Sequence, residues 1–123
     1  MTLPPGDTFL LFVYGTLMRD GVNHSLLAGQ RFLGSARTRP RYALFNLIDY
    51  RGLVECEHDG TVVHGELYEV SRTLLPRLDE LEEAPTLFRL VPIEIEETAE
   101  PVYAYLYQQD TRGFSRCTDV QGK

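Results

Sequence analysis

The chain has 123 residues, of which 43% are hydrophobic, and a formal net charge of −6. This length suits one domain with a real core, and the composition argues against disorder. The negative charge disfavours binding to nucleic acid, and the longest apolar run is too short to cross a bilayer. We predict a single domain over residues 1–123, with its core at about 9–108 and flexible ends at 1–8 and 109–123.

Residues 9–13 form a continuous apolar run that is too short for a buried helix and is typical of a strand covered on both faces. Tyr14, Gly15 and Thr16 then break the run, and Gly15 would permit a sharp turn. Main-chain amides at Gly15, Thr16 and Leu17 could point into one concavity and bind a small anion without a basic side chain. The alternative is an ordinary exit from a strand with a structural glycine.

A polar segment at residues 18–23 indicates a loop. Asn23 can cap a short helix that carries Leu26 and Leu27, and Gly29 would end it. A basic cluster follows over residues 31–41. It could line an anionic site or simply balance the acidic remainder of the chain, and its members are Arg31, Arg37, Arg39 and Arg41.

Three strands are predicted in the middle of the chain. Residues 42–50 are apolar and aromatic with a turn at 49–52, and residues 53–57 form a brief strand before a second turn at 58–60. Residues 61–70 alternate between the two faces, as in a half-buried strand.

A helix is predicted over residues 73–83. Pro76 must lie in the first helical turn, where a missing N–H costs nothing. Thr73 as the N-cap would place Pro76 at the third helical position. The apolar face of this helix consists of Leu74, Leu75, Leu78 and Leu81.

Glu82 is the one acid of this helix that falls inside the leucine arc, at about 40° from Leu78 on a wheel of about 100° per residue. Its neighbours Asp79, Glu80 and Glu83 fall outside the arc. A carboxylate on an apolar face is disfavoured unless it is paired, hydrogen-bonded or protonated. Burial would raise its pKa toward the range of a general base or acid. The alternatives are that the helix ends before Glu82, or that Glu82 pairs with an arginine such as Arg89.

Two further strands are predicted at residues 88–97 and 102–108. Pro92 cannot donate to a ladder, so the first strand should lie at an edge or be bulged there. In the second strand, Tyr103, Tyr105 and Tyr107 share one face and could wall a pocket, although strand tyrosines usually pack in a core. Five or six strands with one convincing helix predict an α+β fold, a small mixed, mostly antiparallel β-barrel with one or two short helices.

The two cysteines, Cys56 and Cys117, form no C-x-x-C and no metal spacing, which fits a reduced, cytoplasmic setting. No basic segment precedes the first apolar run, so no secretory signal is predicted. The three histidines are scattered singly, as surface or packing residues are, and we predict no metal site.

Five short segments recur in an order that is informative as a set. They are Tyr14-Gly15-Thr16-Leu17, Asn23-His24-Ser25-Leu26-Leu27, residues 63–70, residues 78–82 and Ala104-Tyr105-Leu106-Tyr107. Together they resemble the gamma-glutamylcyclotransferase-like family, of the gamma-glutamylamine cyclotransferase type. The resemblance covers nearly all of residues 9–108 and implies that family's small mixed barrel. It also implies that the segment from Tyr14 to Leu17 holds the gamma-glutamyl group and that Glu82 is the catalytic glutamate. From its place on the tyrosine face of the last strand, we also predict that Tyr107 contacts the substrate.

The resemblance also implies a reaction. A gamma-glutamyl amine or amide becomes 5-oxoproline and a free amine when the substrate's own alpha-amine attacks its gamma-carbonyl. Such a reaction requires no serine or cysteine nucleophile, no metal and no cofactor. It requires a near-attack conformation and a proton carrier, and one carboxylate with a raised pKa can be that carrier. The amides at Gly15 to Leu17 could hold either the alpha-carboxylate or the developing oxyanion.

Two departures from the family pattern bear on substrate choice. Glu83 and Ala84 follow the glutamate where the family usually has glycine, and Phe88 stands where it usually has tyrosine. The first departure could change how Glu82 is aimed, and it motivates a second hypothesis. In that alternative the chain is a non-catalytic binding module for a gamma-glutamyl or other small acidic metabolite.

Overall fold

The computed structural model describes residues 3 and 5–117. Residues 1–2 and 4 of the flexible end predicted at 1–8, and residues 118–123 of the one predicted at 109–123, lie outside this part. The described chain forms eight strands, two short 3₁₀-helices and one α-helix. In chain order these are β1 (Thr8–Val13), η1 (His24–Leu27), β2 (Arg31–Arg37), β3 (Tyr42–Asn46), β4 (Arg51–Glu55), β5 (His64–Ser71), η2 (Arg72–Leu74), α1 (Leu75–Glu82), β6 (Phe88–Ile93), β7 (Val102–Tyr107) and β8 (Ser115–Arg116).

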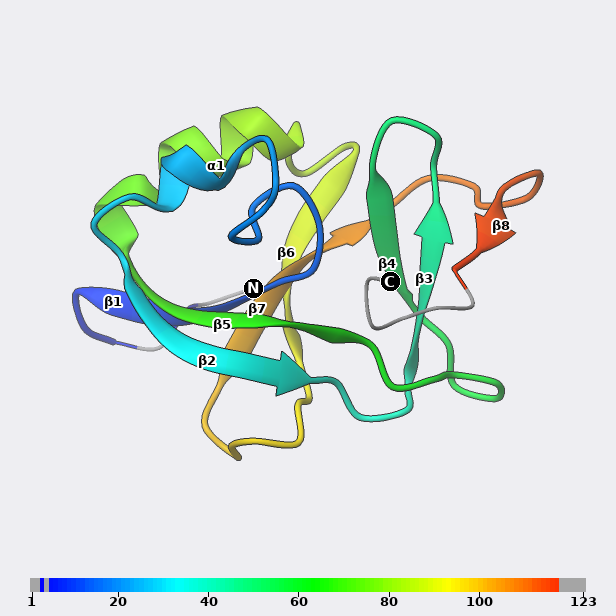
Figure 1. Cartoon of the computed structure of the whole chain (residues 1–123), viewed down its shortest axis with the longest axis horizontal. Helices are drawn as coiled ribbons and strands as arrows, with labels where there is room; N and C mark the ends of the chain where they lie inside the picture. Colours follow the sequence, from blue (N-terminus) through cyan, green and yellow to red (C-terminus); the bar gives the residue numbers. More distant parts are fainter. Residues whose placement is uncertain (1–2, 4, 118–123) are drawn as a thin grey trace.

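The strands form one curled sheet in the order β2-β5-β1-β7-β4-β3-β8, and β6 pairs with β7 from outside this path (Figure 1). The pairings of β1 and β4 with β7 are parallel, whereas the other strand pairs are antiparallel. The sheet curls into a half-barrel with α1 at one end. The prediction of an α+β fold with a mixed, mostly antiparallel sheet is therefore confirmed.

Strand β7 lies at the centre of the sheet. One of its edges pairs with two different strands, β1 and β4, so the sheet forks along that edge. Its other edge pairs with β6 along the whole strand, from Phe88 opposite Tyr107 to Ile93 opposite Val102. On the forked edge, β1 pairs only with the start of β7 and β4 only with its end, at Leu53 opposite Leu106. The sheet opens between β1 and β4, and the chain leaves β1 at this fork.

The core lies on both faces of β7. Tyr103 and Tyr105 belong to one hydrophobic cluster, which includes Leu78 of α1, while Val102, Ala104 and Leu106 belong to the other. The alternation predicted for residues 102–108 is thus confirmed. Pro92 lies on β6, which among the described strands pairs only with β7, so its prediction as an edge residue is also confirmed.

Strand β2 was not predicted. Residues 31–37 pair with β5 and carry a bulge between Phe32 and Gly34, where Gly34 has a φ of 136°. The bulge interrupts the alternation that reveals a strand, which explains why the pattern was missed. The arginines predicted here as a basic cluster each pair with a glutamate, which favours the charge-balancing alternative. The pairs are Arg31 with Glu69, Arg37 with Glu97, Arg39 with Glu96 and Arg41 with Glu94.

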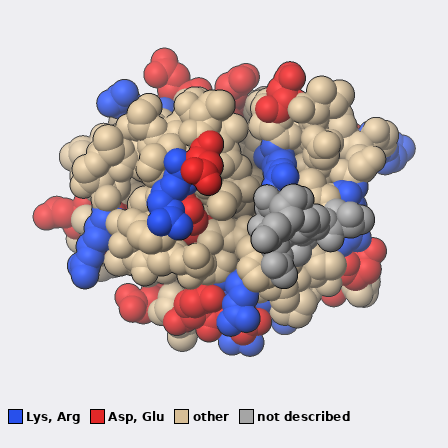
Figure 2. Space-filling view, viewed as in Figure 1, with Lys and Arg blue, Asp and Glu red and all other residues tan. Residues whose placement is uncertain are grey.

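Basic and acidic side chains alternate over the face seen in Figure 2, without one continuous patch of either sign. The exposed ion pairs of β2 and the segment after it are separated by 3.2 to 3.8 Å between nitrogen and oxygen. Exposed pairs of this kind contribute little to stability. Among the described residues no helix is long and apolar enough to span a membrane.

Some predicted boundaries are wrong. The side chain of Ser71, not Thr73, caps the helical segment, and a turn of 3₁₀-helix precedes α1, which begins at Leu75. Pro76 does lie in the first turn of α1, as predicted. The predicted flexible end at 109–123 contains β8, which pairs with β3 at Phe45 and Asn46.

Candidate active site

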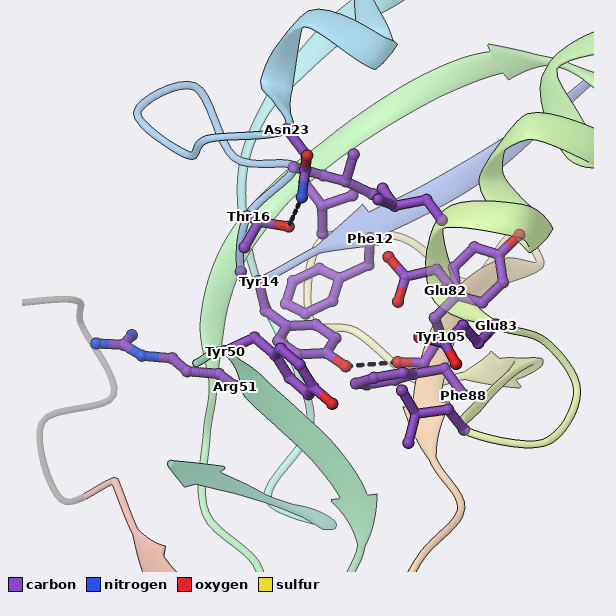
Figure 3. Close-up of a pocket in the computed structure, with 15 residues that line it drawn as sticks. Phe12, Tyr14, Thr16, Asn23, Tyr50, Arg51, Glu82, Glu83, Phe88 and Tyr105 are labelled. Atoms are coloured by element: carbon purple, nitrogen blue, oxygen red, sulfur yellow. Dashed lines mark hydrogen bonds between the residues drawn. The ribbon is translucent and has the colours of Figure 1, made fainter. Parts of the chain in front are cut away.

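A cavity of about 180 Å³ lies where the end of β1 faces the C-terminal end of α1 (Figure 3). This volume is below the roughly 300 Å³ at which pockets for drug-sized ligands begin, so it suits a small metabolite. Segments far apart in the sequence supply its walls. The lining residues are Phe12 to Leu17, Asn23, Tyr50, Arg51, Leu81, Glu82, Glu83, Leu87, Phe88 and Tyr105.

Glu82 is the last residue of α1, and its carboxylate is directed into the cavity (Figure 3). Burial raises the pKa of this carboxyl from its ordinary 4.5 to about 7, and desolvation is the cause. The helix therefore reaches Glu82, and the predicted inward placement of its side chain is confirmed. Arg89, the predicted alternative partner, lines a different hollow beside Pro85 and Leu90. Leu81 departs from the predicted arc, because it is 36% exposed at the cavity rim.

The raised pKa makes stability depend on pH through Glu82. The folded protein binds a proton at Glu82 more tightly than the unfolded chain does. The contribution of this protonated carboxyl to the free energy of unfolding is therefore fully present below pH 4.5 and is lost as the pH rises through 7. We expect Glu82→Gln to be more stable than wild type by about 2 to 3 kcal/mol at pH 8, and by roughly 1 kcal/mol or less at pH 5. Urea unfolding of both proteins at the two pH values measures this difference. An equal difference at both would contradict the assigned pKa.

Opposite Glu82, the chain leaving β1 turns around the cavity. The amide of Met18 donates to the carbonyl of Gly15 at 3.0 Å, which closes a turn. The amides of Gly15, Thr16 and Leu17 themselves donate to no other group of the described chain. Three successive unpartnered amides at a cavity wall can attract an anion. These residues do line a concavity, whereas the orientation of their amides into it and the binding of an anion there stay predictions.

Glycine is required in this loop at a position that the sequence did not indicate. The chain does turn at Gly15, as predicted, but Gly15 has no left-handed backbone conformation and a Cβ there would meet nothing within 4 Å, so this turn does not require glycine. A Cβ at Gly21 would overlap the main chain of Thr16. Gly21 therefore lets the later part of the loop pack directly on the carbonyl group of Thr16 beside the cavity.

Asn23 and His24 form hydrogen bonds that fix the loop at Thr16 and Leu17. The prediction that the Asn23 side chain caps η1 is wrong. Its Nδ2 instead donates to Thr16 Oγ1 at 2.9 Å, and its main-chain amide donates to the Thr16 carbonyl. His24 Nδ1 lies 3.0 Å from the carbonyl of Leu17, and because a carbonyl only accepts, this nitrogen carries the proton. Asn23 also lines the cavity. The helix does end before Gly29, as predicted.

Tyr14 connects the two branches of the fork in the sheet. Its hydroxyl donates to the carbonyl of Tyr105 on β7 at 2.5 Å and accepts from the amide of Leu53 on β4 at 3.2 Å. Burial raises the pKa of this phenol far above its usual range. The hydroxyl is thus engaged with the main chain, and the cavity receives the ring of Tyr14. Tyr14 lines the cavity, and its predicted role in binding substrate stays a prediction.

An aromatic wall completes the cavity. Tyr105 lines it, and its hydroxyl donates to Asp79 of α1 at 2.7 Å, which joins the helix to β7. Phe88 packs against Tyr50, with ring centroids 5.8 Å apart. Tyr107, predicted to contact the substrate, is not among the lining residues and packs on the ring of Phe88 at 5.4 Å.

Tyr50 was missed as a site residue because it was assigned to the turn after a predicted strand. Arg51 lines the cavity, yet its side chain extends away from Glu82 (Figure 3). Within the described residues, no group of three or more histidine, cysteine or acidic side chains could hold a metal ion.

The arrangement combines a partly buried carboxylate, a row of unpartnered amides and an aromatic wall around a small cavity. A family model described as gamma-glutamyl cyclotransferase, AIG2-like, matches residues 11–121. A Vibrio cholerae protein provisionally named a gamma-glutamylcyclotransferase is 41% identical over 103 residues, which cover 84% of this chain and 85% of that protein. The human gamma-glutamylaminecyclotransferase is 31% identical over 94 residues, which cover 71% of this chain and 61% of the human protein.

The fold comparison agrees with the sequence comparisons. The crystal structure of an AIG2-like protein from Mus musculus superposes with a TM-score of 0.71 at 26% identity, covering 86% of this chain and 80% of the mouse chain. The family match spans most of the chain, including both walls of the cavity. This chain belongs to the gamma-glutamyl cyclotransferase, AIG2-like family.

Proposed function

We propose that this protein is a gamma-glutamyl cyclotransferase that releases 5-oxoproline and a free amine from a small gamma-glutamyl amine or amide. The observation that carries the proposal is the Glu82 carboxylate, whose pKa burial raises to about 7, in a small cavity across from three unpartnered amides. The family and the names of the relatives support this class of activity. The particular substrate and the roles of the residues are our proposal.

In the proposed step the alpha-nitrogen of the substrate attacks its own gamma-carbonyl carbon. The new N–C bond closes the five-membered ring, and the C–N bond to the leaving amine breaks. Ionised Glu82 takes one proton from the alpha-ammonium before the attack and donates it to the leaving nitrogen. The second proton, which the ring nitrogen loses as the new amide forms, also passes through Glu82 to the released amine, which leaves as an ammonium ion, so no proton is gained or lost overall. A carboxylate whose pKa is near 7 can do both at neutral pH.

The amides of Gly15, Thr16 and Leu17 are proposed to hold the alpha-carboxylate of the substrate. This anion carries a full charge before the reaction begins, and a row of amides binds such a charge without a counter-ion. With the carboxylate held at one wall, the alpha-amine would lie toward Glu82 at the other. Fixing the folded conformation in this way can lower the barrier by several kcal/mol, of the order of 7 at best.

The change from glycine to Glu83 after the proposed catalytic residue does not alter how the helix ends. Glu83 adopts the left-handed conformation, with φ 52° and ψ 46°, that glycine adopts most readily at the end of a helix. Its amide donates back to the carbonyls of Asp79 and Glu80. The helix therefore closes in the usual way, which weakens the reason to regard the chain as a binding module alone.

A panel of gamma-glutamyl amines, gamma-glutamyl dipeptides and glutathione tests the proposal directly. We expect at least one gamma-glutamyl amine to release 5-oxoproline, and chromatography of the product measures this release. Binding of a glutamyl ligand in calorimetry, with no turnover of any member of the panel, would instead establish the non-catalytic binding module.

A further inference from the structure

Glu66 is a buried charged residue on β5 that takes no part in the step proposed above. Glu66 is only 6% exposed, and among the described residues, tyrosines aside, Thr38 is the only other polar residue that is buried. A buried carboxylate is retained only when its oxygens are well bonded. Here the donors come mainly from the loop that carries the unpartnered amides.

Three hydrogen bonds reach the Glu66 carboxylate. The main-chain amide of Arg19 donates to Oε1 at 3.0 Å, and Arg19 Nε donates to Oε2 at 3.0 Å. The hydroxyl of Tyr68 donates to Oε1 at 3.2 Å. Arg19 thus offers both a main-chain and a side-chain donor to one carboxylate, an arrangement that fixes the backbone as well as the guanidinium.

The same residue secures both ends of the segment between β1 and Arg19. In the antiparallel ladder, Glu66 lies opposite Val13, the last residue of β1. Its side chain then binds Arg19, six residues later, and the turn from Gly15 to Met18 lies between the two attachments. The amides of Gly15, Thr16 and Leu17 therefore lie in a short closed loop whose ends meet at one glutamate.

Aromatic rings pack beside this attachment. The guanidinium of Arg19 lies 4.3 Å from the centroid of the Phe32 ring, and Phe32 packs on Tyr68 with centroids 5.3 Å apart. The ring of His24, whose Nδ1 binds the Leu17 carbonyl, lies 6.1 Å from that of Tyr68. The Glu66 side chain of this pair is 7% exposed, whereas the Arg19 side chain is 56% exposed, so only the carboxylate end of the attachment is buried.

We propose that Glu66, through Arg19, is a positioning residue that holds the amides of Gly15, Thr16 and Leu17 in place for the substrate carboxylate. This inference rests on the proposed function of the cavity. It is separate from the role of Glu82, because Glu66 touches the loop and not the cavity. A displacement of the amides by about 1 Å could cost as much as about 100-fold in kcat/KM, so a lost attachment should be measurable.

Glu66→Gln is the test variant, because glutamine keeps the shape but removes the charge and one acceptor. We expect KM for the best substrate of the panel to rise at least about tenfold, with kcat changed by less than about threefold, since ground-state binding of the carboxylate is weakened. We also expect the amides of Met18 and Asn23, both hydrogen-bonded within the loop, to exchange with solvent at least about tenfold faster by NMR. The amides of β1 should keep their wild-type protection.

Glu69→Gln is the matched control. Glu69 lies on the same strand, is paired with Arg31 and Thr8, and does not touch the loop. Its KM and loop exchange should stay within about twofold of wild type, because exposed pairs contribute little. If Glu66→Gln does not fold, Arg19→Ala provides a second, milder test. It removes the Nε hydrogen bond to Glu66 but keeps the main-chain one, and the Arg19 side chain that it truncates is 56% exposed.

The outcomes separate this inference from the proposed function. A raised KM together with faster exchange of the Met18 and Asn23 amides supports the positioning role. A lowered melting temperature with unchanged KM and unchanged loop exchange overturns it and leaves Glu66 a purely structural residue. If wild type itself releases no 5-oxoproline, the proposed function fails, and the exchange measurement alone decides whether Glu66 holds the loop.

Discussion

Glu82→Gln should lower the rate of 5-oxoproline release by about 10² to 10⁴-fold, the range over which positioned acid–base groups act. Glutamine keeps the size and one hydrogen-bond acceptor of glutamate, but it cannot take the proton of the alpha-ammonium. Residual turnover would come from the folded conformation of the bound substrate. Single-turnover assays with the best substrate of the panel measure this loss.

The matched control for this prediction is Glu80→Gln. Glu80 lies on the same helix but is exposed, outside the leucine arc and away from the lining of the cavity. Its turnover should stay within about twofold of wild type. Because Glu82→Gln is expected to be the more stable protein at pH 8, a loss of turnover could not be attributed to unfolding. Normal turnover by Glu82→Gln would disprove the mechanism.

Tyr14→Phe should destabilise the protein by about 2 to 4 kcal/mol. The substitution leaves the amide of Leu53 and the carbonyl of Tyr105 without the partner they share, inside the fork between β1 and β4. An unsatisfied buried polar group costs about 1 to 3 kcal/mol, and the substitution leaves two such groups, the Leu53 amide and the Tyr105 carbonyl, without this partner. Urea unfolding at one pH measures the change.

Tyr107→Phe serves as the control for Tyr14→Phe. Tyr107 is only half-buried and contacts Phe88 through its ring, so loss of its hydroxyl should change stability by about 0.5 kcal/mol or less. The alternative role for Tyr14 makes the opposite prediction. If Tyr14→Phe were as stable as wild type but had a raised KM, its hydroxyl would bind substrate instead of joining the two branches of the sheet.

The sequence predicted the position of Glu82 because local rules determine it. Pro76 sets where the helix can begin, and the leucine spacing then sets which way each following side chain points. The last strand was predicted for the same reason, since strict alternation from Val102 to Tyr107 marks a strand with two covered faces. Both features depend on neighbours within a few residues.

What was missed depends on partners distant in the chain or on competing bonds. Strand β2 carries a bulge at Gly34 and leaves Phe32 and Leu33 about 40% exposed, so its pattern does not alternate. Asparagine is a common N-cap residue, yet the side-chain amide of Asn23 donates to the hydroxyl of Thr16 on the other side of the loop. Glu66 looked like an ordinary member of a strand, because its burial depends on Arg19, which lies 47 residues earlier.

The central claim is that Glu82 is a carboxyl poised to exchange a proton near neutral pH. The most direct measurement is the pH titration of its side-chain carboxyl carbon by ¹³C NMR, with the resonance assigned by its absence in Glu82→Gln. A midpoint at about 7 is the predicted result, since burial raises the pKa of this group. A midpoint near the ordinary 4.5 would show a solvated carboxylate and contradict the account.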